Sequence, residues 1–139
     1  MEQRRLVRDR AKGRCEYCQC QEDFATESFS IEHIIPVAAD GETELDNLAF
    51  ACQGCNSHKY TKTNAPDPAD DQIAPLFHPR QHRWEEHFCW SEDFLEIIGL
   101  TATGRATVAA LKLNRHRVVN LRRAMYVLGE HPPVAVGNE

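Results

Sequence analysis

The sequence lacks a long apolar run and an overall positive charge. No stretch of its 139 residues approaches the ~18 consecutive apolar residues of a membrane span, and its first residues lead into no signal-peptide-like apolar region. The formal net charge of -5 argues against a uniformly basic nucleic-acid-binding surface. Internal repeats and low-complexity tracts are also missing. We therefore expect one small cytoplasmic domain, or a small module with an extension, and no contact with a membrane.

The basic residues are gathered in two segments. Residues 4–14 hold six Arg or Lys against the single acid Asp9, and residues 101–129 hold six Arg or Lys and no carboxylate. Such segments can contact phosphates even in an acidic protein, because local charge acts at close range. Solvated helix faces without further function would give the same pattern.

Four of the six cysteines form two C-x2-C pairs, Cys15/Cys18 and Cys52/Cys55, separated by about thirty residues. In a reducing compartment such pairs are metal ligands more often than disulfides. Four thiolates at this spacing predict a closed tetrahedral Zn²⁺ site with a structural role. Two cysteines remain. Cys20 could compete for the metal, but its spacing is less usual, and Cys89 suits a small core residue.

Hydrophobic periodicity and turn residues predict short helices and strands in the first half, and so an α+β fold. A helix over residues 3–13 precedes the first cysteine pair. Strands are expected at 29–33 and 48–51, and a helix over about 55–62 follows the second pair. The cysteine pairs thus stand before the first strand and at the end of the second.

The second half predicts a small extension packed on this core. Residues 64–76 are rich in Pro and Asp and predict a linker or loop. The linker would join a core at 1–63 to an extension at 77–139, in which we expect a hairpin and two helices. The helices are expected from an N-cap at Thr103 to about residue 113, and over about 115–128.

Apolar residues of the extension are expected to form its core. Trp84 and Trp90 are assigned to the core rather than to platforms for nucleobases. The last helix carries an apolar stripe that is expected to be buried: Val118, Val119, Leu121, Met125 and Leu128.

Groups that a structural zinc site does not need lie between and beside the cysteine pairs. Glu32 and His33 are adjacent, Asn47 lies in the loop before the second strand, and Asn56 comes directly after the second pair. Together with the cysteines, this order resembles the HNH endonuclease family and its ββα-metal (His-Me finger) fold over roughly residues 10–63. The later stretch 77–106 is similar to a bacterial subgroup of these proteins.

The resemblance implies a role for each of these groups. It implies His33 as general base and Asn47 as the loop residue that orients it. It also implies Glu32 and Asn56 as ligands of a catalytic divalent cation. The family usually has Asp where Glu32 stands and often has His at the position of Asn56. An amide oxygen is a hard neutral ligand that favours Mg²⁺ or Mn²⁺ over Zn²⁺. His58 is the alternative second ligand.

Phosphodiester hydrolysis fits these groups. A cation must stabilise the leaving oxygen, and an imidazole can deprotonate water near neutral pH. Adjacent side chains on a strand point to opposite faces, so Glu32 and His33 can serve one site only if the strand ends or bends there. Lys59 and Lys62 are expected to neutralise phosphates, with plain solvent exposure as the alternative for Lys62.

The resemblance therefore predicts a metal-dependent endonuclease that cuts DNA, most simply double-stranded DNA, and leaves 5′-phosphate and 3′-hydroxyl ends. A catalytically inactive, zinc-stapled nucleic-acid- or protein-binding module is the alternative. A rubredoxin-like iron site is a third. The adjacent Glu32 and His33 favour the enzyme, because neither alternative needs them. The sequence contains no recognisable groove-reading element and leaves the oligomeric state open.

Overall fold

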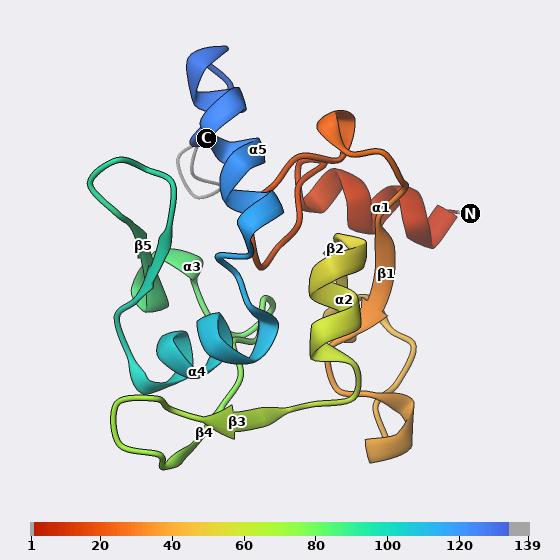
Figure 1. The fold of residues 1–139 in the computed structure, drawn as a ribbon. Helices are drawn as coiled ribbons and strands as arrows, with labels where there is room; N and C mark the ends of the chain where they lie inside the picture. Colours follow the sequence, from red (N-terminus) through yellow and green to blue (C-terminus); the bar gives the residue numbers. More distant parts are fainter. Residues whose placement is uncertain (1, 134–139) are drawn as a thin grey trace.

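The computed structural model describes residues 2–133 (Figure 1). Its α-helices are α1 (Glu2–Arg10), α2 (Gln53–Lys59), α3 (Trp84–His87), α4 (Ala102–Leu111) and α5 (His116–Val127). Its strands are β1 (Ser30–His33), β2 (Leu48–Ala51), β3 (Asn64–Pro66), β4 (Ile73–Pro75), β5 (Phe88–Trp90) and β6 (Ile97–Gly99). Short 3-10 turns occupy Glu22–Phe24, Val37–Ala39 and Leu45–Asn47. The strands pair as three small antiparallel sheets, which confirms the predicted α+β class.

The first half contains a strand–strand–helix unit. β1 pairs antiparallel with β2, so that His33 lies opposite Leu48 and Glu32 opposite Ala49. All four residues of β2 are buried, and α1 packs on β2 while α2 packs on β1. Figure 1 shows α2 lying alongside this hairpin, with α1 at its upper end. The predicted strands are present, with the first beginning one residue later than expected.

The second cysteine pair itself begins α2. Cys52 is the N-cap, and its Sγ accepts a hydrogen bond from the Cys55 amide at 3.4 Å. A side-chain acceptor at this position satisfies one of the free amides of the first turn. The helix therefore starts at Gln53, two residues earlier than predicted, and ends at Lys59. The same turn thus places the metal ligands and fixes the direction of the helix.

The Pro- and Asp-rich segment is not a plain linker. Its ends, β3 and β4, form a hairpin in which Ala65 and Ala74 are buried. Asp67 stabilises the turn, because its Oδ1 accepts a hydrogen bond from the Ala69 amide and its backbone carbonyl accepts one from Asp71. The same carboxylate binds Arg105 of α4 through two hydrogen bonds of 2.9 and 2.8 Å. The acidic residues therefore order the segment.

The extension packs on the core through α4, which contacts α2, β3, β4 and β6. The N-cap of α4 is Thr101, not Thr103 as predicted. Its Oγ1 accepts from the Gly104 amide at 3.0 Å, and Thr103 lies buried inside the helix.

The predicted apolar stripe of α5 is at most half-buried, and the fully buried residue of that helix is Arg122. Arg122 donates to the Leu113 carbonyl at 2.7 Å. This helix therefore packs through a buried, hydrogen-bonding arginine together with a half-buried apolar face. No helix in the described range is long and apolar enough to cross a membrane.

Candidate active site and zinc centre

The four predicted zinc ligands meet at one buried point. The Sγ atoms of Cys15, Cys18, Cys52 and Cys55 all lie within 4.8 Å of one another. The Sγ atoms of Cys18 and Cys52 are 3.7 Å apart. A tetrahedral Zn²⁺ with Zn–S bonds of about 2.3 Å requires sulfur atoms about 3.8 Å apart. The donor set and its spacing therefore fit a structural Zn²⁺.

The remaining thiol of the first half, Cys20, lies beside this cluster. Its Sγ is 3.2 Å from Cys18 Sγ, and the residue is half-buried. It is not among the four sulfur atoms that surround the common centre.

His33 stands where β1 ends. Its side chain is half-buried, and its Nε2 lies 2.8 Å from Thr43 Oγ1 in the following loop. The ring is therefore neither sealed inside apolar packing nor free to rotate without losing a hydrogen bond. Thr43 is a site residue that the sequence reasoning missed, because a threonine in a polar loop carries no distinguishing pattern.

Asn47 fastens the loop that carries Thr43. Its Oδ1 accepts from the Ile35 amide at 2.9 Å, and its Nδ2 donates to the carbonyls of Ile35 and Glu42 at 3.0 and 2.8 Å. Through these three hydrogen bonds, the side-chain amide of Asn47 holds the backbone of Ile35 and Glu42 together. Asn47 is thereby linked to His33 through the placement of Thr43, with no direct bond between their side chains among the described residues.

Glu32 points to the opposite side of β1 from His33. Its side chain is only 6% exposed. It accepts a hydrogen bond from the Tyr17 hydroxyl at 2.7 Å and lies 3.4 Å from Lys59 Nζ. Burial raises the pKa of Glu32, while the charge of Lys59 and the bond from Tyr17 act against this rise. Glu32, the predicted cation ligand, is therefore enclosed by the protein, and the positive charge of Lys59 compensates its negative charge.

Lys59 lies inside the protein and not on its surface. Its side chain is 2% exposed, and its Nζ donates to the Ile34 carbonyl at 2.9 Å. The reason is that α2 packs directly on β1, so a side chain at this helix position meets the strand end. A phosphate contact, as predicted from the sequence, is not open to this ammonium group in the structure. Lys62 is exposed, and its Nζ donates to the His58 carbonyl at 3.0 Å.

Helix geometry separates the two candidate second ligands. Asn56 is three residues before Lys59 and shares its helix face, whereas residues two apart, such as Asn56 and His58, face different ways. Since Lys59 contacts Glu32, Asn56 lies on the face directed toward Glu32. The Asn56 side chain makes no hydrogen bond within residues 2–133. The pKa of His58 is lowered by partial burial and by the positive charges of Arg115, Lys112 and Lys62.

The comparison with protein families decides the identity of this segment. Residues 15–62 match the model of the family described as HNH endonuclease. This segment is an HNH domain. No curated protein and no solved structure matches the chain. The HNH domain begins at the first zinc ligand, contains both strands of the first hairpin, and ends just beyond α2.

The extension contributes a positive charge to the four-cysteine cluster from outside the matched segment. Arg115, the residue before α5, places its guanidinium 3.7 Å from the Sγ atoms of both Cys52 and Cys55. Four thiolates around Zn²⁺ carry a formal double negative charge, which a nearby cation stabilises. Gly54 permits this approach, since a Cβ there would lie 2.8 Å from Arg115 Nη2. Arg115 belongs to the acid-free basic segment 101–129, whose composition does not indicate a contact with thiolates.

Proposed function

We propose that the protein is a metal-dependent endonuclease that hydrolyses phosphodiester bonds of double-stranded DNA. The family match over residues 15–62 carries this proposal. It is supported by the placement of His33 at a strand end, with its ring partly exposed and held by Thr43. A half-exposed imidazole fixed at one nitrogen suits a group that must reach a water molecule and an incoming phosphate.

In the proposed mechanism His33 is the general base that removes a proton from the attacking water. Thr43 holds the ring, and Asn47 holds the loop that carries Thr43. The two are therefore positioning residues. Lys62, exposed beyond the end of α2, is available for a phosphate of the DNA backbone. With the 3′ oxygen as the leaving group, as the resemblance to the HNH family implies, attack by water would leave 5′-phosphate and 3′-hydroxyl ends.

Glu32 and Asn56 would hold the catalytic Mg²⁺ or Mn²⁺, and because Glu32 and His33 leave β1 on opposite sides, that cation would share a phosphate with His33 around the strand end at His33. A carboxylate and an amide fit such an ion, which takes few protein ligands and keeps several waters. When bound, it would stabilise the charge on the leaving oxygen. Asn56 is preferred over His58, because it shares the face of Lys59 and because the positive charges of Arg115, Lys112 and Lys62 near His58 disfavour a further cation there. The ammonium of Lys59 already neutralises Glu32, so a cation at Glu32 has to share or replace that contact.

The second candidate is an inactive, zinc-stapled module that binds nucleic acid. One observation favours it: Glu32 is enclosed by Tyr17 and Lys59, an arrangement that is stable without a catalytic cation. Both candidates place the protein in the cytoplasm, where reducing conditions keep the four thiols available for zinc.

Cleavage of supercoiled plasmid decides between the two. The full chain is incubated with plasmid and either Mg²⁺ or Mn²⁺, beside a His33→Ala variant and a His116→Ala control on the exposed start of α5. The endonuclease predicts nicked or linear plasmid with the parent and the control, and at least about 100-fold less with His33→Ala. If the parent leaves the plasmid intact with both metals yet shifts it in a gel, the binding module is correct.

A further inference from the structure

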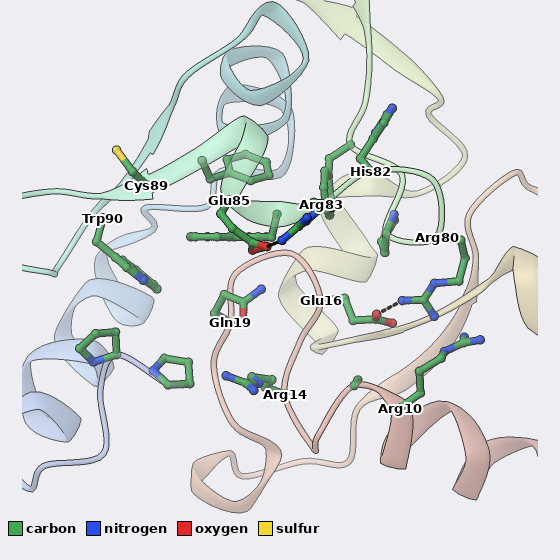
Figure 2. Close-up of a pocket in the computed structure, with 17 residues that line it drawn as sticks. Arg10, Arg14, Glu16, Gln19, Arg80, His82, Arg83, Glu85, Cys89 and Trp90 are labelled. Atoms are coloured by element: carbon green, nitrogen blue, oxygen red, sulfur yellow. Dashed lines mark hydrogen bonds and ion pairs between the residues drawn. The ribbon is translucent and has the colours of Figure 1, made fainter. Parts of the chain in front are cut away.

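A large cavity lies between the first half and the extension, outside the site described above. Its volume is about 810 Å³, within the range of small-molecule and cofactor pockets. Figure 2 shows residues of α1 and the first cysteine loop on one side, and residues 79–90 on the other. Neither the sequence nor the HNH match assigns a function to it.

The rim of this cavity is positively charged. Four arginines and two glutamates line it, so it carries an excess of two positive charges in a chain of net charge -5. Arg80 is paired with Glu16, and Arg83 lies 3.5 Å from Glu85 with its own side chain 69% exposed. Of the other two arginines, Arg14 is buried and Arg10 donates to the Leu45 and Leu48 carbonyls, so Arg83 is the arginine of the lining most open to a ligand. This imbalance favours an anionic ligand.

The wall of the cavity is aromatic. Trp84 and Trp90 both line it, with ring centroids 5.5 Å apart and planes inclined by 39°. Trp84 is fixed by a hydrogen bond from its Nε1 to the Tyr17 carbonyl at 3.1 Å. Trp90 contacts Arg122, whose Cζ lies 5.2 Å from the ring centroid, and the edge-on ring of His131. The rings were expected to be core residues. They pack against the core on one side and are half-exposed to the cavity on the other.

The cavity adjoins the strand that pairs with His33. Arg10 and Arg80 both donate to the Leu48 carbonyl, at 2.7 and 3.3 Å. Leu48 lies opposite His33 in the β1–β2 register. Neighbouring strands are ~5 Å apart. A nucleic-acid strand at His33 can therefore reach the cavity within a few nucleotides.

We propose that this cavity binds an unpaired nucleotide of the nucleic acid on which the HNH domain acts, with its base against Trp84 and Trp90 and its phosphate at the exposed Arg83. Every base offers a π-face to an aromatic ring, and arginine side chains bind phosphate in a bidentate manner. The proposal rests on the proposed function only in taking nucleic acid as the substrate. It adds that the substrate carries a single-stranded or extruded position next to the cut.

The chain provides its own reporter, because Trp84 and Trp90 are its only two tryptophans. The experiment uses the full-length His33→Ala variant without added Mg²⁺ or Mn²⁺, so that binding is measured without cleavage. Tryptophan emission is titrated with a 12-nucleotide oligothymidylate, with the same strand in a blunt duplex, and with polyphosphate of equal charge. Stacking predicts strong quenching by the single strand and at least about fivefold weaker apparent affinity for the duplex.

Two charge reversals test the location. Arg83→Glu changes an exposed rim residue, and Arg117→Glu makes the same change on exposed α5, outside the cavity. We expect Arg83→Glu to weaken binding of the oligonucleotide severalfold and to reduce its salt dependence by about one unit of slope, with little change for Arg117→Glu. A Trp90→Phe variant should retain part of the quenching through Trp84.

The outcomes separate this proposal from the proposed function. Absence of quenching by the oligonucleotide overturns the nucleotide site, even if the parent protein cuts plasmid. Equal quenching by polyphosphate also overturns it, because a purely electrostatic surface needs no base. Equal losses for Arg83→Glu and Arg117→Glu would place binding elsewhere. Quenching by the single strand with loss at Arg83 supports the site, whether or not cleavage is found.

Discussion

Lys59 Nζ lies 3.4 Å from Glu32 Oε2, and these side chains are 2% and 6% exposed. The ammonium group thus stands against the one carboxylate that the proposed mechanism assigns to a catalytic cation. A buried carboxylate requires a positive partner, and α2 supplies one from its last residue. Binding of a divalent cation at Glu32 is therefore an exchange, or a sharing, between two cations.

Lys59→Met removes the ammonium and leaves the Glu32 carboxylate buried and uncompensated. The free energy of unfolding should fall by about 3–5 kcal/mol, measured by urea denaturation. The double variant Glu32→Gln, Lys59→Met should recover part of this loss, and Lys62→Met, on the surface, should change stability by less than about 0.5 kcal/mol. Added Mn²⁺ should raise the melting temperature of Lys59→Met more than that of the parent. Equal responses to Mn²⁺ would show that Glu32 does not receive the cation.

Arg115 joins the extension to the four-cysteine cluster. Arg115→Ala removes the positive charge 3.7 Å from Cys52 and Cys55, so the thiolates should release zinc to a chromogenic chelator roughly tenfold faster. Gly54→Ala should act in the same direction, because its Cβ would displace the guanidinium. Arg117→Ala, which is exposed, is the matched control. Identical zinc release from all four proteins would exclude a role for Arg115 in holding the metal.

Asn47 carries the loop between the two strands on three hydrogen bonds. Asn47→Ala removes all three, and at about 1 kcal/mol each the free energy of unfolding should fall by roughly 2–3 kcal/mol. Asn47→Asp should be no better, because its carboxylate cannot donate to the Ile35 and Glu42 carbonyls. Asp46→Ala, at the exposed neighbouring position, should be close to the parent in urea denaturation. A stable Asn47→Ala protein would mean that the loop is held by other contacts.

The stability of the residues 78–82 turn should depend on pH. His78 Nδ1 accepts from the Arg80 and Gln81 amides, and its pKa is lowered from 6.5 by burial and by neighbouring His82. The unfolded chain therefore binds more protons just below pH 6.5. Stability should be full above pH 6.5 and fall as the pH drops toward the folded pKa, by less than about 1.4 kcal/mol per pH unit.

His78→Asn keeps a hydrogen-bond acceptor and removes the titration. Urea denaturation at pH 7.5 and 6.0, with zinc content checked at each pH, should show a smaller loss for this variant than for the parent. His116→Asn, on the exposed surface of α5, should behave as the parent. An unchanged slope in His78→Asn would assign the pH dependence to other groups.

The local parts of this fold could be read from the sequence, and the tertiary ones could not. Period-two alternation located β1, the short apolar run at 48–51 located β2, and the C-x2-C pairs located the candidate zinc ligands, because all three patterns depend on neighbours in sequence. The β3–β4 hairpin was missed, since Pro and Asp are typical of loops. The turn of this hairpin is held by the pairing of Asp67 with Arg105 of α4, which is distant in sequence.

The site shows the same division. The order of Glu32, His33, Asn47 and Asn56 predicted an HNH domain, and the family match confirms it. The enclosure of Glu32 depends on Tyr17 and Lys59, which reach it from other elements only after folding. Likewise, no spacing in the sequence indicates that Arg115 faces the thiolates.

Thr43 gives the sharpest test of how the base is held. Its Oγ1 lies 2.8 Å from His33 Nε2, and the residue is exposed, so its hydroxyl can be removed with little effect on packing. In the proposed endonuclease, Thr43→Val should lower the single-turnover cleavage rate about tenfold, because the imidazole loses the bond that fixes its orientation. Thr43→Ser restores the hydroxyl and should restore most of the rate, which a purely steric role for the side chain would not predict. Thr61→Val makes the same change on the exposed turn after α2 and should cut at the parent's rate. All variants should unfold within about 0.5 kcal/mol of the parent. If Thr43→Val cuts as fast as the parent, the hydroxyl does not position His33.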